Sequence, residues 1–256
     1  MAVDWSLTGK VAIITGAAKG GIGEAYAHTL AEAGASVVCA DMNVDGATVV
    51  ADAITAAGGT ATALAVDIAD EASVAEMVEA TVSEYGGVDV LVNNAALMAQ
   101  IVMTAASDYT RADWDRAFAV NVTGAWQCIK AVTSSMRERG GGRIVNQASA
   151  GAFPAETVYG ITKLALVGLT TTMARELGPS GITVNCIAPG ITASDAGKML
   201  TPPEGEFRQA IDAKAALRAV GDPEELCGAL LLLCSPAGGW MTGQVLHVDG
   251  GWVLRP

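Results

Sequence analysis

The chain has 256 residues, of which 51% are hydrophobic, and it carries a formal net charge of −12 at pH 7. This apolar fraction allows a large buried core and excludes a disordered chain, and the acidic balance without any basic run argues against a nucleic-acid partner. Five cysteines lie apart in apolar segments without a C-x-x-C pair, and no apolar run is long enough to span a membrane. We therefore expect a soluble cytoplasmic protein with no metal site.

Short β-type runs alternate with helical runs along nearly the entire chain, which fits one domain covering residues 1–256. The predicted strands are Val11–Thr15, Ser36–Ala40, Thr60–Val66, Val88–Val92, Arg143–Val145, Ile182–Ile187 and Gln244–Val248. The predicted helices are Ile22–Ala33, Val44–Ala57, Glu71–Tyr85, Ala112–Arg139, Val158–Leu177 and Pro223–Cys234. This alternation predicts an α/β fold, a Rossmann-type three-layer αβα sandwich around a mostly parallel seven-stranded sheet.

Candidate ligand-binding residues follow the predicted strands, where parallel sheets hold their ligands. The first strand is followed by T-G-A-A-K-G-G-I-G, from Thr15 to Gly23, where glycines and a helix N-terminus suit a phosphate. Asp41 ends the second strand, where a carboxylate binds ribose hydroxyls and repels a 2′-phosphate, which favours NAD over NADP. Two alternatives stay open: Asp41 or Asp45 merely caps the next helix, or Lys19 pairs with a 2′-phosphate.

Polar residues also follow the third and fourth predicted strands. Asp67 comes after the third strand, and Asn93, Asn94 and Ala95 come after the fourth. Short polar groups at these points suit an adenine and ribose slot, although Asn also suits a simple turn.

Tyr159 and Lys163 lie four residues apart at the start of the predicted helix Val158–Leu177. This spacing places the phenol and the ammonium on one helix face, and a nearby cation lowers the pKa of a phenol. Such a tyrosine can act as an acid or base near neutral pH. By itself the pair is also compatible with an ordinary amphipathic helix, so its meaning depends on a cofactor site elsewhere in the chain.

From Leu7 to Gly251 the sequence resembles the short-chain dehydrogenase/reductase family of the single-domain type with about 250 residues. The matching stretches are T-G-A-A-K-G-G-I-G, the D-I of Asp67-Ile68, N-N-A-A, N-V-T-G, R-I-V-N-Q-A-S, Y-G-I-T-K, I-A-P-G-I-T and T-G-Q-V-L-H-V-D-G-G. Each stretch is weak alone, but all of them occur in the family's order.

The resemblance implies a catalytic set of Asn121, Ser149, Tyr159 and Lys163. Tyr159 would be the acid/base, Lys163 would bind the nicotinamide ribose, Ser149 would hold the substrate oxygen, and Asn121 would shape a helix that positions a water. Cofactor contacts would come from Gly16, Lys19, Gly21, Ile22, Gly23, Asp41, Asp67, Ile68, Asn94, Ala95, Tyr159, Lys163, Pro189, Gly190, Ile191, Thr192 and Ser194. Of these, the segment from Pro189 to Ser194 would hold the nicotinamide amide.

The sequence departs from the family pattern at three places. The glycine turn is one residue longer, so that Lys19, Gly20 or Gly21 is an insertion; Ala96 stands where glycine is commoner; and only ten residues separate Ser149 from Tyr159, where thirteen is usual. The shorter loop would reshape the substrate pocket, whose walls we expect at Leu97–Met103 and Ala150–Glu156. These segments are mostly small or apolar, which suggests a modest hydrophobic alcohol or ketone.

We therefore predict an NAD-dependent oxidoreductase that interconverts a small-molecule secondary alcohol and a ketone. The resemblance further implies a substrate lid around residues 191–217 and a homotetramer that uses residues 112–139 and 158–177 and the segment Trp240–Trp252. An NADPH-linked 3-oxoacyl-thioester reductase is the alternative enzyme, and a non-catalytic dinucleotide-binding sensor is the alternative from another class.

Overall fold

The structure is a computed structural model, in which residues 3–98, 104–200, 204 and 206–254 are described. Seven strands form one sheet in the order β3-β2-β1-β4-β5-β6-β9, and every neighbouring pair is parallel. They are β1 (Val11–Thr15), β2 (Ser36–Asp41), β3 (Thr60–Ala65), β4 (Val90–Asn93), β5 (Gly142–Gln147), β6 (Ile182–Pro189) and β9 (Val245–Val248). The predicted seven-stranded parallel sheet is confirmed.

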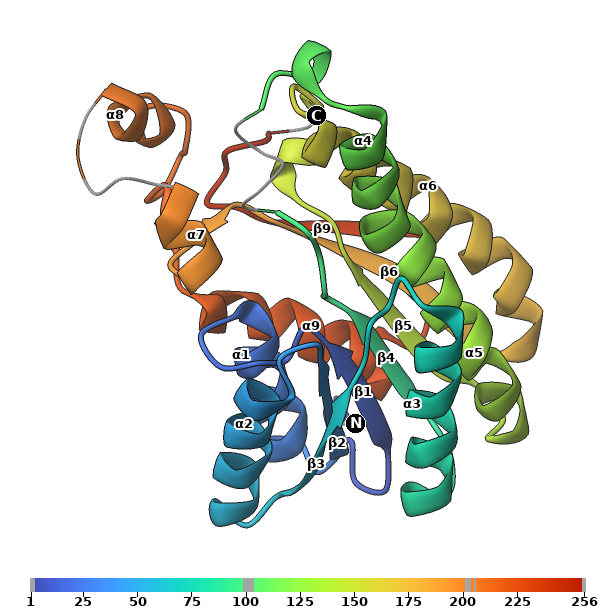
Figure 1. Ribbon diagram of the computed structural model, residues 1–256. Coiled ribbons are helices and arrows are strands. Elements are labelled where there is room, and N and C mark those ends of the chain that lie inside the picture. Colours follow the sequence, from blue (N-terminus) through green and yellow to red (C-terminus); the bar gives the residue numbers. More distant parts are fainter. Residues whose placement is uncertain (1–2, 99–103, 201–203, 205, 255–256) are drawn as a thin grey trace.

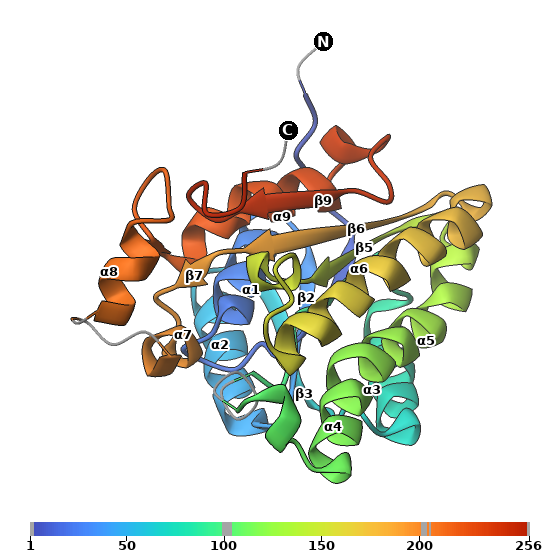
Figure 2. The same ribbon diagram turned by 90° about the horizontal axis from the view of Figure 1, so that it is seen from above.

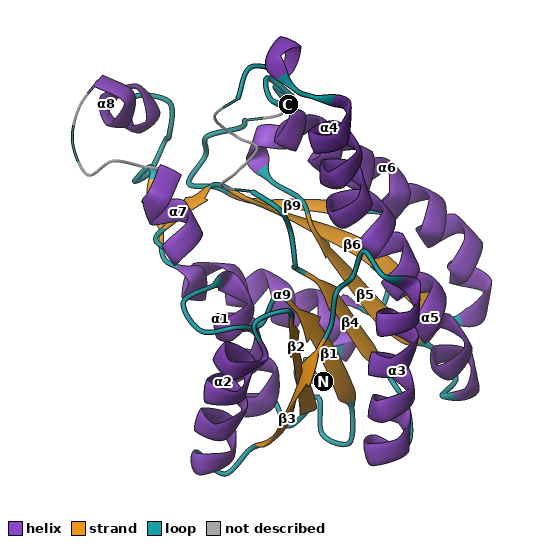
Figure 3. Ribbon diagram, in the orientation of Figure 1, coloured by secondary structure: helices purple, strands orange, loops and turns teal. Residues whose placement is uncertain are grey.

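Helices cover both faces of this sheet (Figures 1 and 3). One layer contains α1 (Ile22–Glu32), α2 (Val44–Ala56) and α9 (Cys227–Cys234), and the other contains α3 (Glu71–Tyr85), α4 (Arg111–Phe118), α5 (Ala125–Glu138) and α6 (Val158–Leu177). Two separate hydrophobic cores result, one between the sheet and the first layer and one between the sheet and the second. The predicted three-layer αβα sandwich is thus confirmed.

The predicted continuous helix over 112–139 is wrong in one respect. Between α4 and α5 the chain forms a π-helical turn at Ala119–Gly124, which inserts a wider turn into the helix. The sequence of residues 199–218 has little helical periodicity, but the segment contains helical structure. The helix α8 (Glu206–Asp212) lies within it, and α7 (Asp195–Leu200) overlaps its start. These two short helices stand away from the sandwich, above the carboxyl edge of the sheet (Figures 1 and 2).

A two-stranded parallel ribbon lies at the base of α7 and α8. It pairs β7 (Ile191–Thr192), which directly follows β6, with β8 (Val220–Gly221). We call the segment between these strands, residues 193–219, the excursion. Both of its ends lie at the β7–β8 ribbon beside the sheet. In the described ranges no helix has the length and apolar character needed to cross a membrane.

A buried ion cluster closes the opposite edge of the sheet. The Asp89 carboxylate accepts the backbone N–H of Val11 at 2.9 Å and pairs with Arg139 at 2.8 Å and Lys10 at 3.3 Å. Burial alone would raise the pKa of Asp89, but these hydrogen bonds and charges outweigh it and lower the pKa. The cluster joins the start of β1 to the end of α5.

Candidate active site

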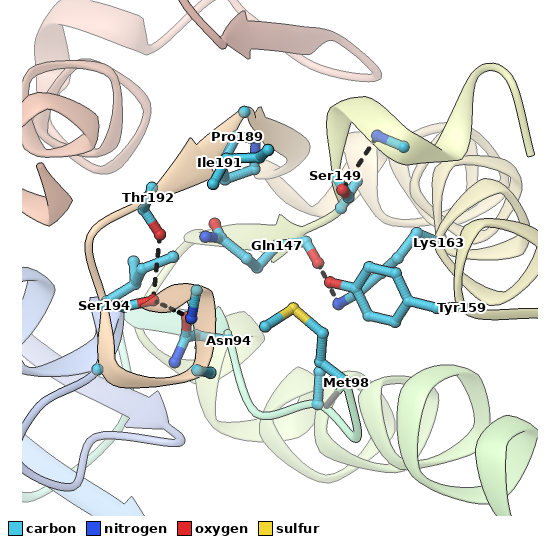
Figure 4. A pocket seen from close by; sticks show the side chains of 18 of the residues that line it. Asn94, Met98, Gln147, Ser149, Tyr159, Lys163, Pro189, Ile191, Thr192 and Ser194 are labelled. Carbon is cyan, nitrogen blue, oxygen red and sulfur yellow. Dashed lines mark hydrogen bonds between the residues drawn. The ribbon is translucent and has the colours of Figure 1, made fainter. Parts of the chain in front are cut away.

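A cavity of about 960 Å³ opens at the carboxyl edge of the sheet, where the strand ends and the excursion meet. Its lining includes the glycine turn after β1, the ends of β4, β5 and β6, the start of α6 and the C-terminal segment (Figure 4). The predicted site residues that line it are Gly16, Lys19, Gly21, Ile22, Asp41, Asn94, Ala95, Ser149, Tyr159, Lys163, Pro189, Gly190, Ile191, Thr192 and Ser194. Segments more than 200 residues apart in the chain thus converge on one space.

The glycine turn packs closely against the end of β4. Gly16 has a φ of +69°, and a Cβ added there would lie 2.8 Å from the Cα of Ala95. A Cβ on Gly23 would lie 2.1 Å from the carbonyl oxygen of Gly16, so only glycine allows α1 to start this close to the strand. The Asn94 side chain then donates to the Gly16 carbonyl at 2.9 Å and holds the turn in place.

The longer turn brings Lys19, Gly21 and Ile22 to the cavity wall together with Gly20. Gly20 has a φ of +89°, its N–H donates to the Glu24 carboxylate at 2.7 Å, and its carbonyl accepts the Asp195 N–H at 2.9 Å. The glycine turn is therefore bonded directly to the start of α7.

Asp41 is held by the glycine turn rather than by the helix that follows it. Its carboxylate accepts the N–H of Ala18 at 3.0 Å and the N–H of Asn43 at 2.9 Å. The N-cap of α2 is Asn43, whose side chain accepts the Gly46 N–H at 3.1 Å, so the capping alternative for Asp41 and Asp45 is wrong. The Asp41 carboxylate is left at the cavity wall.

Three predicted cofactor residues do not line the cavity. Asp67 is exposed beyond β3, and its carboxylate accepts the N–H of Ala69 at 2.9 Å. Ile68 is buried in the core beneath α3 and α5. Gly23 lies behind Gly16, where it acts through packing.

Ser149, Tyr159 and Lys163 meet on one side of the cavity (Figure 4). Lys163 is 1% exposed, and its Nζ donates to the Gln147 carbonyl at 2.7 Å and lies 5.5 Å from the centroid of the Tyr159 ring. The Ser149 Oγ accepts the Gly151 N–H at 3.1 Å. Ser149 and Tyr159 therefore line the same cavity in spite of the short loop between them.

In the protein without a ligand, burial has the largest effect on the pKa values of Lys163 and Tyr159. Burial lowers the pKa of Lys163 to about 8 and raises the pKa of Tyr159, while the Ser149 side chain acts in the opposite direction on the tyrosine. The prediction that the pKa of Tyr159 is lowered is therefore wrong for the ligand-free protein. The Lys163 ammonium is directed at the Gln147 carbonyl, and the partly buried phenol is stabilised in its neutral form.

Asn121 acts beneath the cavity instead of lining it. It lies in the π-helical turn, is 2% exposed, and exchanges two hydrogen bonds with the backbone of Leu97, at 2.7 and 3.0 Å. Its side-chain nitrogen also donates to the Thr162 hydroxyl at 3.1 Å. Asn121 thus ties the chain after β4 to α6 one residue before Lys163, which is the arrangement of a positioning residue.

The segment after β6 forms the opposite wall. The Thr192 and Ser194 hydroxyls lie 3.2 Å apart, and the Ser194 hydroxyl accepts the N–H of Gly197 at 3.2 Å (Figure 4). The predicted walls are described only in part: Met98 lines the cavity, whereas residues 99–103 lie outside the described residues. From the loop 150–156, Gly151, Pro154 and Glu156 line it.

The sequence did not predict several other lining residues as individual site residues. They include Ala18, Gln147, Thr157, Asp195, Lys214 and the C-terminal residues Trp252, Val253 and Leu254. Gln147 could have been singled out, because it is a polar residue at the end of an apolar strand. The C-terminal residues carry no such signal, because only the fold brings them beside the excursion, where the Gly250 carbonyl accepts the Leu217 N–H at 2.8 Å.

Comparisons with known proteins agree with this architecture. A family profile described as Enoyl-(Acyl carrier protein) reductase matches residues 16–253. An uncharacterised oxidoreductase of Mycobacterium tuberculosis strain H37Rv is 44% identical over 250 residues, which are 96% of this chain and 98% of that protein.

Two solved structures extend the comparison. A 7α-hydroxysteroid dehydrogenase complexed with NADH and 7-oxo glycochenodeoxycholic acid superposes with a TM-score of 0.90 at 38% identity, covering 98% of this chain and 97% of that one. A Beutenbergia cavernae protein whose structure contains NADP superposes with a TM-score of 0.89 at 36% identity, covering 97% and 98%. The chain therefore belongs to the short-chain dehydrogenase/reductase family of oxidoreductases.

Proposed function

We propose that the protein is an NAD(H)-dependent oxidoreductase that interconverts a secondary alcohol and a ketone. The observation that carries the proposal is the meeting of Ser149, Tyr159 and Lys163 in one cavity with a glycine turn and the Asp41 carboxylate. The residues suit a dinucleotide: the glycine turn leads into the N-terminus of α1, which has no side-chain cap and suits a pyrophosphate, and Asp41 offers a carboxylate to ribose hydroxyls. When bound, the nicotinamide supplies the hydride exchange.

The protein's own groups manage the proton and the substrate oxygen. In reduction the neutral Tyr159 phenol donates its proton to the ketone oxygen, which the Ser149 hydroxyl holds and stabilises. The resulting phenolate is stabilised by the Lys163 ammonium, which is largely charged at pH 7 because its pKa is about 8. Oxidation of the alcohol runs through the same groups in reverse.

The variant Tyr159→Phe tests this assignment. It should abolish turnover over a panel of secondary alcohols, sugars, sterols and acyl thioesters while the protein still binds NADH. Surviving turnover would contradict the role of Tyr159. A wild type that binds NADH but turns over no substrate of this panel would favour the non-catalytic sensor.

The choice between NAD and NADP depends on two oppositely charged residues that line the cavity, Asp41 and Lys19. The Asp41 carboxylate is bonded to the backbone of the glycine turn and would repel a 2′-phosphate, which favours NAD. The solved relative that contains NADH supports this choice, and the one that contains NADP supports the alternative. Measured Kd values for NADH and NADPH decide it, and a strong preference for NADPH would contradict the role given to Asp41.

An NADPH-dependent 3-oxoacyl-thioester reductase is the second candidate. Lys19 favours it, because a cation in the glycine turn can pair with a 2′-phosphate, and the description of the matching family profile names a reductase of acyl carrier protein substrates. Turnover of acetoacetyl-CoA with NADPH at a higher kcat/KM than any simple ketone with NADH would select this candidate.

We infer that residues 191–217 form the substrate lid of the single domain 1–256. One end of this segment is bonded to the glycine turn, from the Asp195 N–H to the Gly20 carbonyl at 2.9 Å, and the other to the C-terminal segment through Leu217. Met199 and Leu217 are 76% and 75% exposed, which is apolar surface that a closing lid would cover. Protection of this segment from limited proteolysis by cofactor plus substrate would support the inference.

We also propose a homotetramer in the cytoplasm. Trp126 and Leu164, on α5 and α6, and the fully exposed Trp240 are large apolar side chains at the surfaces predicted to associate. All five cysteines are free, which suits a reducing compartment. Light scattering that shows a monomer would contradict the tetramer.

A further inference from the structure

The side chain of Gln147 lies at the floor of the cavity with an unused hydrogen-bond donor. Gln147 is the last residue of β5, is 5% exposed, and extends between the Tyr159–Lys163 side and the Thr192 side of the cavity (Figure 4). Its Nε2 is buried and has no hydrogen-bond partner among the described residues. A buried amide donor without a partner is rare, because it forfeits its hydrogen bonds to water.

The orientation of this amide is fixed by Tyr26. The Tyr26 hydroxyl donates to Oε1 of Gln147 at 2.9 Å, and Tyr26 on α1 is fully buried. Burial raises the pKa of Tyr26, so that the phenol keeps its proton, and Oε1 is the one acceptor for that proton in the described part of the chain. The amide therefore turns its oxygen to Tyr26 and its nitrogen away from it.

The two ends of Gln147 serve different parts of the site. Its backbone carbonyl accepts the Lys163 ammonium at 2.7 Å, which fixes the residue beside the catalytic group. Its side chain reaches toward Ile191 and Thr192, at the wall that follows β6 (Figure 4). A ligand group bridging these two walls passes directly over the amide.

We propose that Nε2 of Gln147 donates a hydrogen bond to the carboxamide oxygen at the nicotinamide end of the bound dinucleotide. The inference rests on the proposed function, since it assigns one further contact to the same cofactor. A carboxamide oxygen supplies the acceptor that the protein lacks, and the satisfied donor would help to fix the plane of the ring against the substrate.

The test compares two ligands that differ in the nicotinamide ring. Calorimetry would give the Kd values of NAD⁺ and of ADP-ribose, which lacks that ring, for the wild type and for Gln147→Met. We expect the variant to bind NAD⁺ about tenfold more weakly and ADP-ribose unchanged, because one buried hydrogen bond is lost. Thionicotinamide adenine dinucleotide, whose sulfur is a poor acceptor, should show a much smaller difference between the two proteins.

Two further variants separate binding from folding. Gln147→Met alone leaves the buried Tyr26 hydroxyl without its acceptor, whereas in Tyr26→Phe/Gln147→Met both buried polar groups are gone. The ligand-free double variant should therefore unfold at the same or a higher temperature while the selective loss of NAD⁺ affinity persists. Gln127→Met is the matched control: Gln127 is a buried glutamine whose Nε2 donates to the Ile68 carbonyl at 2.7 Å, so its loss should lower stability without changing the ratio of the two Kd values.

Two results would overturn the inference alone. An equal loss of affinity for NAD⁺ and ADP-ribose in Gln147→Met would show that Gln147 merely supports the fold, and unchanged affinity for both would show that Nε2 makes no contact. A wild type that binds neither NAD⁺ nor NADP⁺ would instead overturn the proposed function together with this contact.

Discussion

Replacing Lys163 by Met should stabilise the ligand-free protein at pH 7 while it abolishes activity. Lys163 is 1% exposed, and the described residues offer its ammonium no carboxylate partner. The fall in its pKa from 10.5 to about 8 corresponds to about 3 kcal/mol of instability at pH 7, since each pKa unit is worth about 1.4 kcal/mol. Loss of the hydrogen bond to the Gln147 carbonyl offsets about 1 kcal/mol, which leaves a net gain of about 2 kcal/mol.

The pH dependence of this gain follows from the direction of the pKa change. Below about pH 8 both the folded and the unfolded chain hold the Lys163 proton, so the cost of a buried cation is complete. Between about pH 8 and 10.5 the folded protein has lost a proton that the unfolded chain retains, and the cost disappears. Buried cysteines and tyrosines also titrate in this window, but those that Lys163 does not influence are common to both proteins and cancel in the difference. Cys186 is the exception, because the charge of Lys163 lowers its pKa.

Urea unfolding of the wild type and Lys163→Met at pH 7 and 9.5 measures the effect. The variant should be about 2 kcal/mol more stable at pH 7 and nearly equal to the wild type at pH 9.5. Lys130→Met is the control, because Lys130 is 58% exposed in its pair with Glu71 and should change stability by less than about 1 kcal/mol at either pH. A variant no more stable than the wild type at pH 7, or a difference that does not change with pH, would refute the reasoning.

Four other substitutions have defined outcomes. Gly23→Ala places a methyl group 2.1 Å from a backbone oxygen and should weaken NADH binding at least tenfold, whereas Gly168→Ala, whose methyl group meets nothing within 4 Å, should raise stability by about 0.5–1 kcal/mol in urea unfolding. Asn121→Ala leaves two backbone groups without partners and should cost about 2 kcal/mol and lower kcat, as measured by thermal unfolding and steady-state kinetics. Asp89→Asn should cost about 2 kcal/mol at pH 7, and because the pKa of Asp89 is lowered in the fold, the difference from the wild type should shrink as the pH falls below about 4.

Much of the fold was predictable because local and global preferences agree. The apolar strand Val11–Thr15 and the helix Val158–Leu177 have the bounds that their residue patterns predict. Polar residues after strand ends identified the cavity, since parallel strands bring their carboxyl ends to one edge. Asp41 and Asn94 were found in this way.

The departures lie where tertiary contacts override local pattern. A helical pattern cannot distinguish an α-helix from one that contains a π-turn, and this turn at Ala119–Gly124 is favoured by the contacts of Asn121 with Leu97 and Thr162. The pKa of Tyr159 was misjudged for a similar reason. Spacing shows that Lys163 is near, but only the packed structure shows that burial dominates both groups.

The buried ammonium of Lys163 and the buried amide of Gln147 both destabilise the ligand-free protein, and the two residues are in direct contact. Among the described residues, the first is a buried cation whose one hydrogen bond goes to a neutral carbonyl, and the second is a buried amide donor without a partner. Both groups line the same cavity, so one ligand with hydroxyl and carbonyl oxygens can satisfy both. The arrangement that destabilises the free protein is therefore the one that favours binding of a dinucleotide. The Lys163→Met and Tyr26→Phe/Gln147→Met variants should each lose cofactor affinity without losing stability.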